Sequence, residues 1–232
     1  MTDVPMIETP SPNFDERTSP VSMLVLHYTG MRDAQSAVAW LASPESKVSA
    51  HYVVCEDGQI IRMVDEAKRA WHAGRSHWRG INDVNSASIG IEIVNPGHEW
   101  GYRPFPEAQI GALIPLMHDI VQRHGITRGN IVGHSDVAPA RKQDPGELFP
   151  WGQLARLRLA LPRPTRNLMD PLWTDSAFML ALERFGYDIA EPEAAVVAFQ
   201  RRFRPELIDG VIDGECRAIL LALLLPKPRG DE

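Results

Sequence analysis

Short apolar runs that end in polar side chains are the feature of this sequence that most constrains its fold. The run M-L-V-L at 23–26 is followed by His27, and the run N-I-V-G at 130–133 is followed by His134. Apolar runs of this length are typical of buried strands. A polar side chain at the end of such a strand lies at the rim of a sheet, where α/β proteins build their sites. The sequence therefore predicts a sheet with histidines at one edge.

The loop G-H-S-D-V-A-P-A-R-K-Q-D-P-G at 133–146 carries His134, Lys142 and Asp144 and is stiffened by two prolines. Because a residue before proline is disfavoured in the helical region, Asp144 is expected in extended backbone, held by the loop. A histidine and an aspartate leave a zinc site incomplete, since catalytic zinc usually takes three protein ligands. His27 is the best candidate for the third. The alternative for each histidine is a hydrogen-bonded core or loop residue.

The segment S-I-G-I-E-I-V-N at 88–95 has the alternation of a strand. Its three isoleucines share one face by the period of two, so Glu92 lies on the opposite face beside Gly90. We expect Gly90 to leave space where a substrate can approach. A solvated surface position is the alternative for Glu92.

Five segments together resemble the zinc-dependent N-acetylmuramoyl-L-alanine amidases of the AmpD and AmiD type, the amidase_2 family. They are L-H-Y-T-G at 26–30, V-S-A-H-Y at 48–52, A-W-H-A-G at 70–74, S-I-G-I-E-I at 88–93 and the loop at 133–146. The resemblance covers roughly residues 20 to 160. It implies an α/β fold with a central mixed β-sheet flanked by helices, similar to peptidoglycan-recognition proteins (PGRP).

The same resemblance implies an activity and a site. The activity is hydrolysis of the lactyl amide bond between N-acetylmuramic acid, or its 1,6-anhydro form, and the L-alanine of the stem peptide, in peptidoglycan turnover or recycling. The site is one Zn²⁺ ion held by His27, His134 and Asp144. Glu92 is then the general base and Lys142 holds the oxyanion.

The position of Lys142 two residues before a ligand supports this role if the backbone there is extended. Alternate side chains of an extended chain share a side, so Lys142 is expected to face the metal and Arg141 to point away. A surface charge is the alternative for Lys142.

Substrate contacts are expected near the segment 71–85, which lacks periodicity and concentrates aromatic and amide side chains. Rings stack on sugar faces and amides bond to hydroxyls, as at a sugar-peptide surface. The residues that we expect to contact substrate are His72, Trp78, Arg79 and Tyr28. For a tryptophan, the alternative is a plug at the edge of the core.

Composition and local signals divide the chain into four parts. Residues 1–20 contain four prolines and predict an extended arm without a helix. The amidase domain is expected over 21–161, and a linker rich in proline and arginine over 162–170. A small C-terminal domain follows over 171–227.

Helical spacing at 176–186, 192–203 and 214–225 predicts three helices in this last part. The motif A-F-Q-R-R-F at 198–203 and an Asp-Gly turn are similar to the three-helix peptidoglycan-binding domain. A dimerisation or packing unit is the alternative.

Local signals in the first domain are also clear. Asp33 is a candidate cap for a helix that stops before Pro44. Asp57-Gly58 between two β-rich runs predicts a hairpin.

Composition excludes several classes of protein. A net charge of −6 argues against a nucleic-acid surface, which is basic. Two distant cysteines give neither a metal motif nor a disulfide framework. No H-E-x-x-H segment supports a zinc peptidase.

The expected compartment and partners follow from the remaining features. The N-terminus lacks a secretory signal, and the longest apolar run, near 219–225, is too short to span a membrane. We therefore expect a monomeric cytoplasmic protein, or a periplasmic one if a leader has been removed. The expected partners are peptidoglycan fragments or anhydro-muropeptides. The rival hypothesis is a catalytically silent peptidoglycan-recognition protein on the same fold.

Overall fold

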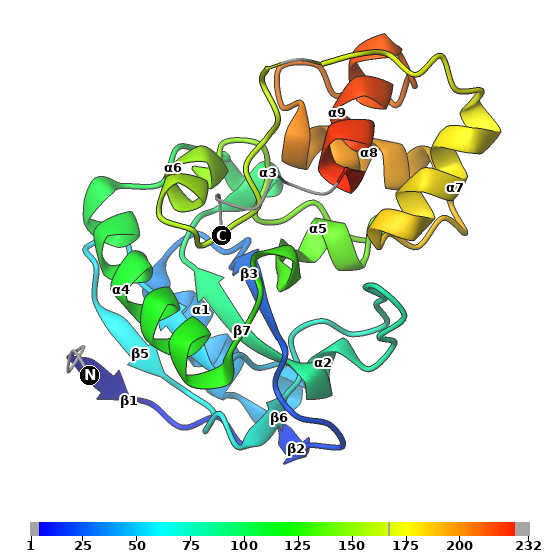
Figure 1. Cartoon of the computed structure of the whole chain (residues 1–232). Helices are drawn as coiled ribbons and strands as arrows, with labels where there is room; N and C mark the ends of the chain where they lie inside the picture. The colour runs from blue at the N-terminus through cyan, green and yellow to red at the C-terminus, as the bar shows by residue number, and fades with distance from the viewer. Residues whose placement is uncertain (1–4, 167, 226–232) are drawn as a thin grey trace.

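The computed structural model describes residues 5–166 and 168–225. Parts of the predicted arm (1–4), linker (167) and C-terminal domain (226–227) lie outside the described residues. A six-stranded mixed sheet with helices on both sides forms the centre of the molecule (Figure 1), which confirms the predicted fold class. In spatial order the strands are β1 (Met6–Glu8), β5 (Ile60–Arg62), β4 (Tyr52–Val54), β7 (Ser88–Ile93), β3 (Met23–Tyr28) and β8 (Ile131–Gly133).

Strand register brings two predicted site residues together. Strand β3 lies between β7 and β8 and is parallel to both, while β4 and β5 form the antiparallel hairpin predicted at Asp57-Gly58. His27 of β3 is paired with Glu92 of β7. Paired residues of neighbouring strands project from the same face, so both side chains lie on one side of the sheet.

Helices and short 3₁₀ turns surround the sheet. Those that precede the C-terminal region are α1 (Ala34–Ala42), η1 (Pro44–Ser46), α2 (Val84–Ala87), α3 (Gly97–Trp100), α4 (Glu107–His124), η2 (Arg128–Asn130), α5 (His134–Val137) and α6 (Trp151–Arg156). As predicted, Asp33 caps α1, where its side chain accepts the Ser36 N–H at 2.7 Å.

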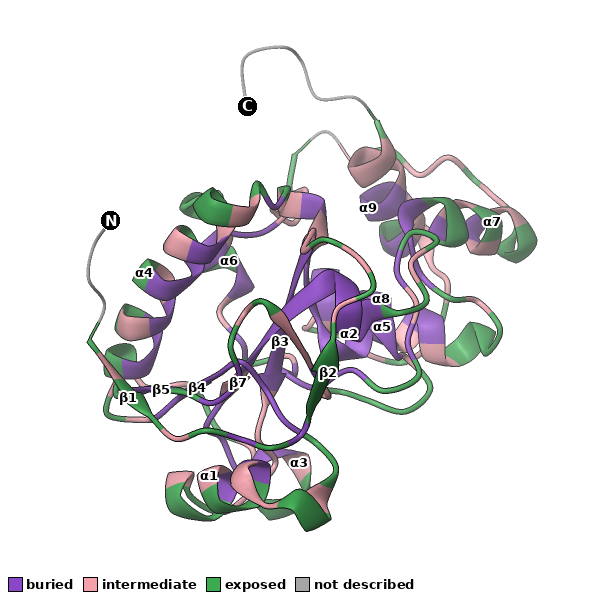
Figure 2. Ribbon diagram, turned by 90° about the horizontal axis from the view of Figure 1, so that it is seen from below, coloured by how far each residue is buried: buried purple, intermediate pink, exposed green. Residues whose placement is uncertain are grey.

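The two faces of the sheet pack against different helices. Leu24 and Leu26 join the isoleucines of β7 in a core with α4 and α6. Met23 and Val25 point the other way, as the period of two requires, and pack in a second core. His27 shares their face. In Figure 2 the central strand β3 is largely buried, whereas β2 (Phe14–Glu16) and the outer sides of α1 and α4 are exposed.

The N-terminal arm is extended and contains no helix over residues 5–20, as predicted. It is not a separate arm, however. Strand β1 pairs in parallel with β5 at the edge of the main sheet, and β2 (Phe14–Glu16) pairs antiparallel with β6 (Lys68–Ala70). This pairing consists of backbone hydrogen bonds with residues about 50 positions later in the chain. No local sequence pattern predicts such bonds.

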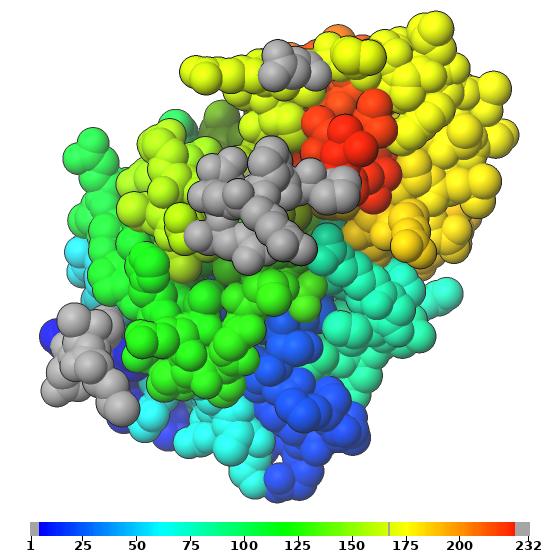
Figure 3. Space-filling model, viewed as in Figure 1, coloured from blue at the N-terminus to red at the C-terminus, as the bar shows by residue number. Residues whose placement is uncertain are grey.

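The C-terminal helices α7 (Asp175–Phe185), α8 (Pro192–Phe203) and α9 (Gly214–Leu224) match the three predicted helices to within one residue. They form a lobe (residues 168–225) at one end of the molecule (Figure 1), and Figure 3 shows the lobe in direct contact with the rest. A continuous cluster of buried side chains runs from Met23 and Val25 of the sheet to Phe178 and Phe199 of the lobe. The lobe is therefore packed on the sheet, with a core in common.

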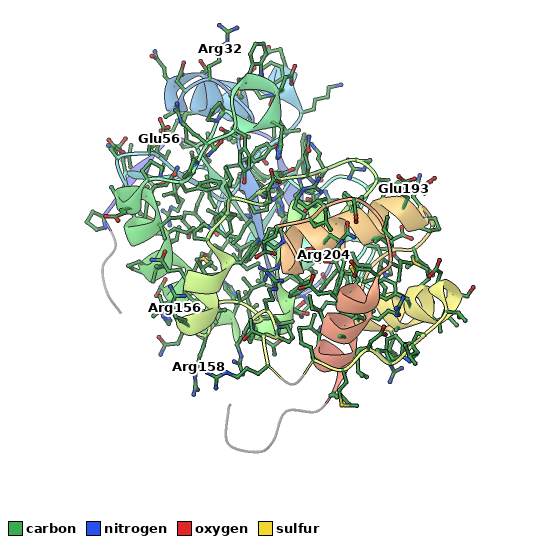
Figure 4. All side chains as sticks on the ribbon, turned by 90° about the horizontal axis from the view of Figure 1, so that it is seen from above. Arg32, Glu56, Arg156, Arg158, Glu193 and Arg204 are labelled. Carbon is green, nitrogen blue, oxygen red and sulfur yellow. The ribbon has the colours of Figure 1, made fainter. Side chains whose placement is uncertain are left out.

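Arg204 lies inside the lobe, beside α8 and α9 (Figure 4). It is 1% exposed. Its Nη2 lies 2.9 Å from Asp209 Oδ1, and Nη1 donates to Asp213. This buried cation therefore has two carboxylate partners.

Both cysteines, Cys55 and Cys216, are buried free thiols, in agreement with the absence of a disulfide framework. Over the described part of the chain, every helix is too short or too polar to cross a bilayer.

Candidate metal centre and its cleft

Three predicted ligands, His27, His134 and Asp144, meet at one point. The two Nδ1 atoms lie 2.9 Å apart, and Asp144 Oδ2 lies 3.1 Å from His27 Nδ1 and 3.0 Å from His134 Nδ1. All three side chains are buried. Donor atoms about 3 Å apart are all within reach of one ion at metal–ligand distances of about 2.0–2.2 Å.

The sheet and the loop explain this convergence. His27 and His134 follow paired segments of β3 and β8, so they emerge at the same edge. The Ser135 N–H donates to the Asp144 carbonyl oxygen at 2.8 Å, which fixes the far end of the loop against the helix that begins at His134.

The donors and acceptors around His134 and Asp144 indicate that a cation can bind between these two side chains. His134 Nε2 lies 3.1 Å from the carbonyl oxygen of Ala73, which can only accept, so Nε2 carries the proton of the neutral ring. When Nε2 carries the only ring proton, His134 Nδ1 presents a lone pair to Asp144 Oδ2, which is also an acceptor. Two facing acceptors repel each other unless a cation neutralises them. The residues therefore fit a metal ion.

Protonation also favours metal binding. Burial, and after it the neighbouring His134, lower the pKa of His27 to about 4, so its ring is neutral at pH 7. Burial opposes ionisation of Asp144, but the two histidines outweigh it and hold the pKa of this carboxyl below its ordinary value. A neutral imidazole at His27 and an ionised carboxylate at Asp144 are donors of the kind that a divalent ion requires.

A chain of hydrogen bonds orients His27 from behind. Its Nε2 lies 3.0 Å from His72 Nδ1, and His72 Nε2 lies 3.2 Å from Ser88 Oγ. Ser88 donates its hydroxyl proton to the Val84 carbonyl oxygen at 2.5 Å. Because the Ser88 hydroxyl proton is used in this bond, Ser88 Oγ accepts from His72 Nε2–H. His72 Nδ1 then accepts from His27 Nε2–H. His27 therefore keeps its proton on Nε2 and presents Nδ1 to the metal position.

Gly90 has a different role from the one expected. A Cβ atom at Gly90 would overlap the His72 ring, so the space beside Glu92 is filled by His72. His72 lines the cleft described below, but it is 7% exposed and both ring nitrogens have partners. Its observed contacts are with the ligand His27 and with Ser88.

A cleft of about 400 Å³ opens over the cluster. Its lining includes His134, Asp144, Glu92, Lys142, Tyr28, Trp40, Trp71, His72 and Arg141. Trp40 and Trp71 are two large rings that we did not predict as site residues. Trp71 stands in the A-W-H-A-G segment, which could have signalled it, whereas Trp40 is on an ordinary exposed helix position.

Glu92 lines this cleft, which resolves the choice between groove and solvent. Among the described residues, its Oε2 is buried without a hydrogen-bond partner. Burial, and then the charge of Asp144, raise the pKa of Glu92 well above its ordinary value, while Lys142 opposes the shift. A carboxyl with a raised pKa in a cleft is a candidate for proton transfer.

Lys142 and Arg141 both line the cleft, so the expectation that Arg141 points away is wrong. The N–H groups of both residues donate to the Ala138 carbonyl oxygen at 3.0 Å, so the backbone turns here and alternation does not apply. Lys142 is exposed. Arg141 Nη2 donates to the Ala73 carbonyl oxygen at 3.0 Å and thereby joins the loop to the segment behind His134.

Tyr28 lines the cleft next to the ligand His27. Its hydroxyl lies 3.0 Å from His98 Nδ1, and His98 Nε2 lies 3.1 Å from Glu147 Oε1. The Glu147 carboxylate accepts a hydrogen bond from Nε2–H. In a neutral ring Nδ1 is then an acceptor, and the Tyr28 hydroxyl donates to it. The phenol is therefore held at the wall of the cleft.

Trp78 and Arg79 are not in the cleft, which corrects the expectation of substrate contact. Trp78 is 2% exposed, donates its indole N–H to the Gly129 carbonyl oxygen at 3.1 Å and packs against rings of the C-terminal lobe. Arg79 Nε donates to the Phe185 carbonyl oxygen at 2.9 Å. Both residues belong to the contact between sheet and lobe, so for Trp78 the core-edge alternative is correct.

The fold and the site together fit a hydrolase: a mixed sheet, a His-His-Asp cluster at one edge that could hold a metal ion, and beside it a carboxyl whose Oε2 is buried without a partner among the described residues. The family described as N-acetylmuramoyl-L-alanine amidase matches residues 17–147. The chain belongs to this family and is an amidase.

Similar proteins extend this result. N-acetylmuramoyl-L-alanine amidase AmiD from Escherichia coli (strain K12) is 40% identical over 231 residues, which cover 88% of this chain and 82% of AmiD. The 1,6-anhydro-N-acetylmuramyl-L-alanine amidase AmpD from Haemophilus influenzae is 34% identical and covers 65% of this chain and 90% of AmpD. A solved structure of E. coli AmiD with the substrate anhydro-N-acetylmuramic acid-L-Ala-D-γ-Glu-L-Lys has a TM-score of 0.80 and 35% identity, and covers 91% of this chain and 97% of that one.

Proposed function

We propose that this amidase uses one Zn²⁺ ion to hydrolyse the lactyl amide bond between N-acetylmuramic or 1,6-anhydro-N-acetylmuramic acid and the L-alanine of the stem peptide. The observation that carries the proposal is the convergence of His27, His134 and Asp144 beside the unpartnered carboxyl of Glu92. Zinc held by such a set supplies a Lewis acid that polarises the scissile carbonyl and acidifies water.

Glu92 moves the proton. Its Oε2 takes a proton from the attacking water as the water oxygen bonds to the amide carbon, and returns it to the alanine nitrogen as the C–N bond breaks. Burial, and after it the charge of Asp144, raise the pKa of Glu92 above its ordinary value, which suits a group that must both accept and donate a proton. Among the described residues no hydrogen bond competes for Oε2, which leaves this atom free to accept and donate the proton.

Lys142 balances the charge of the tetrahedral intermediate. The carbonyl oxygen becomes negative when water adds, and a cation in the same cleft stabilises it. Lys142 is exposed, so its flexible chain can follow the substrate into the cleft. Tyr28, Trp40 and Trp71 offer a hydroxyl and two ring faces for the sugar and peptide.

We propose soluble anhydro-muropeptides as the substrate class, because AmiD, with a TM-score of 0.80 to this chain, was solved with such a molecule. Comparing release of L-alanyl peptide from anhydro-muropeptides with release from intact sacculi tests the preference. Fractionation of cells that express the full-length tagged protein locates the enzyme.

The metal test uses the purified protein. We expect about one zinc per chain, release of L-alanyl peptide from an anhydro-muropeptide, loss of that release with a chelator and recovery with Zn²⁺. The variant Asp144→Ala is expected to bind no zinc and release no peptide, while Asp57→Ala on a distant turn keeps both. A native protein that binds muropeptide but releases nothing at any zinc level would favour the silent recognition protein instead.

A further inference from the structure

The C-terminal lobe contacts the short helix that begins at the ligand His134. Asp136 in this helix is 1% exposed. Its Oδ1 accepts the hydroxyl proton of Tyr187 at 2.5 Å, and its Oδ2 accepts the N–H of Gly133, the residue before the ligand, at 2.8 Å. One carboxylate thus joins the backbone beside a metal ligand to a side chain of the lobe.

A second lobe residue completes the surroundings of this carboxylate. Arg202 of α8 is 7% exposed, and its Nε lies 3.7 Å from Asp136 Oδ2. The guanidinium carbon is 3.2 Å from the ring centroid of Trp151, which fixes the orientation of the cation. A buried carboxylate is tolerated only when it is paired and hydrogen-bonded, and both kinds of partner come from the lobe.

Tyr187 is itself held by the rings of Trp78, Phe185 and Phe199. It is fully buried, and its ring centroid lies 5.1 Å from that of Trp78, whose indole N–H is bound to the Gly129 carbonyl oxygen. The phenol cannot rotate away from Asp136 without breaking this packing. The hydroxyl is therefore preorganised toward the carboxylate.

Helix α5 transmits this contact to two ligands. It begins with His134, and its Ser135 N–H donates to the Asp144 carbonyl oxygen at 2.8 Å. The Val137 carbonyl oxygen accepts the His77 N–H at 2.8 Å, which anchors the other end. A shift of α5 would therefore move His134 and Asp144 relative to His27.

We propose that Tyr187 and Arg202 are positioning residues of the metal centre: through Asp136, the lobe sets the orientation of α5 and with it two of the three ligands. The lobe then serves the metal site directly, in addition to any role in binding cell wall. The choice of metal ligands comes from the proposed function; the contacts of Asp136 do not depend on it.

The test is the variant Tyr187→Phe, which removes one hydroxyl and keeps the ring. We expect its Zn²⁺ affinity, measured by competition with a chelator, to fall about tenfold, as is usual when a partner outside the ligand set is lost. The Co²⁺-loaded variant should show a changed visible absorption spectrum. Tyr52→Phe is the matched control, because Tyr52 is also buried and donates to Glu66 at 2.7 Å, away from α5. It should keep the native affinity and spectrum.

Arg202→Lys is the second variant. It keeps the positive charge but loses the flat guanidinium, so we expect its Zn²⁺ affinity to fall by a smaller factor than that of Tyr187→Phe. Circular dichroism identifies the folded variants. The positioning proposal would be overturned if the folded variants, Tyr187→Phe or Arg202→Lys, kept the native Zn²⁺ affinity and the native Co²⁺ spectrum. The proposed function would not be affected by that result, because it concerns amide hydrolysis by the native enzyme. A native chain that binds neither ion would overturn both proposals.

Discussion

The metal cleft and the C-terminal lobe both bury charged groups, but they treat them in opposite ways. In the lobe, Arg204 is 1% exposed and its two Nη atoms are paired with two aspartates, while its Nε is buried without a partner among the described residues. In the cleft, Glu92 Oε2 has no partner among the described residues, and the acceptors of the ligand cluster face one another. Buried polar groups are normally satisfied, and an unsatisfied carboxylate oxygen that also lines a cleft is a candidate for contact with a bound molecule. The lobe uses charge for structure, whereas the cleft leaves charge available for chemistry.

The largest effect is expected from Glu92→Gln, which keeps the shape of the side chain but removes its ability to exchange a proton. Peptide release should fall about 10³-fold, within the range usual for a general base, while the zinc content stays native. Glu99→Gln, an exposed acid outside the cleft, is the control. Activity within tenfold of native would remove Glu92 from the mechanism.

The same variant tests the cost of the unpartnered carboxyl. The pKa of Glu92 is raised on folding, so its contribution disfavours the folded state increasingly as pH rises above the ordinary carboxyl pKa. Metal-free Glu92→Gln should therefore resist urea better than the metal-free native chain at pH 7, and the difference should shrink toward pH 4. Equal stability of the variant and the native chain at both pH values would show that folding does not raise the pKa of Glu92.

A smaller effect is expected from His72→Phe, which preserves the ring beside Gly90 but removes the acceptor for His27 Nε2. Without that acceptor the tautomer of His27 is no longer selected, and Zn²⁺ affinity should fall about 10- to 100-fold. The matched control is His77→Phe, whose imidazole contacts Asn82 outside the cleft. Native affinity in His72→Phe would assign His72 to substrate contact or packing instead.

The smallest effect on the site is expected from Arg204→Met, which removes the buried charge of the lobe. Unfolding in urea should show a loss of about 1.5–3 kcal/mol, the usual value of hydrogen bonds to a charged group, with native Zn²⁺ affinity. Arg163→Met is the control, because its pairs with Glu206 and Glu215 are at the surface and should contribute less than about 1 kcal/mol. Weakened metal binding in Arg204→Met would mean that the lobe and the cleft are not distinct in their use of charge.

Several features of both regions can be predicted from the sequence alone. The three lobe helices follow from apolar spacing and local caps, and Asp213 indeed accepts the Cys216 N–H at 2.9 Å at the start of α9. The candidate ligands His27 and His134 follow from their positions after short apolar runs. Such signals are local, because capping and strand alternation depend only on neighbours within a few residues.

Predictions failed where contacts join distant parts of the chain. Trp78 looked like a ring for a sugar, yet it packs on Tyr187, more than a hundred residues later. Gly90 looked like room for substrate, yet His72 fills the space. Arg141 is the exception, because a local turn, in which its N–H donates to the Ala138 carbonyl oxygen three residues earlier, replaces the extended backbone that we expected. For Trp78 and Gly90 the residue type was compatible with two environments, and only packing selected one.

The sequence by itself therefore determined which residues could bind a metal and which segments would be helices and strands. Tertiary structure alone decided that the lobe shares a core with the sheet, that Asp136 meets Tyr187, and that Glu92 is left without a partner. The physical reason is that residue type and spacing set local geometry, whereas burial and hydrogen-bond satisfaction depend on which distant surfaces come into contact.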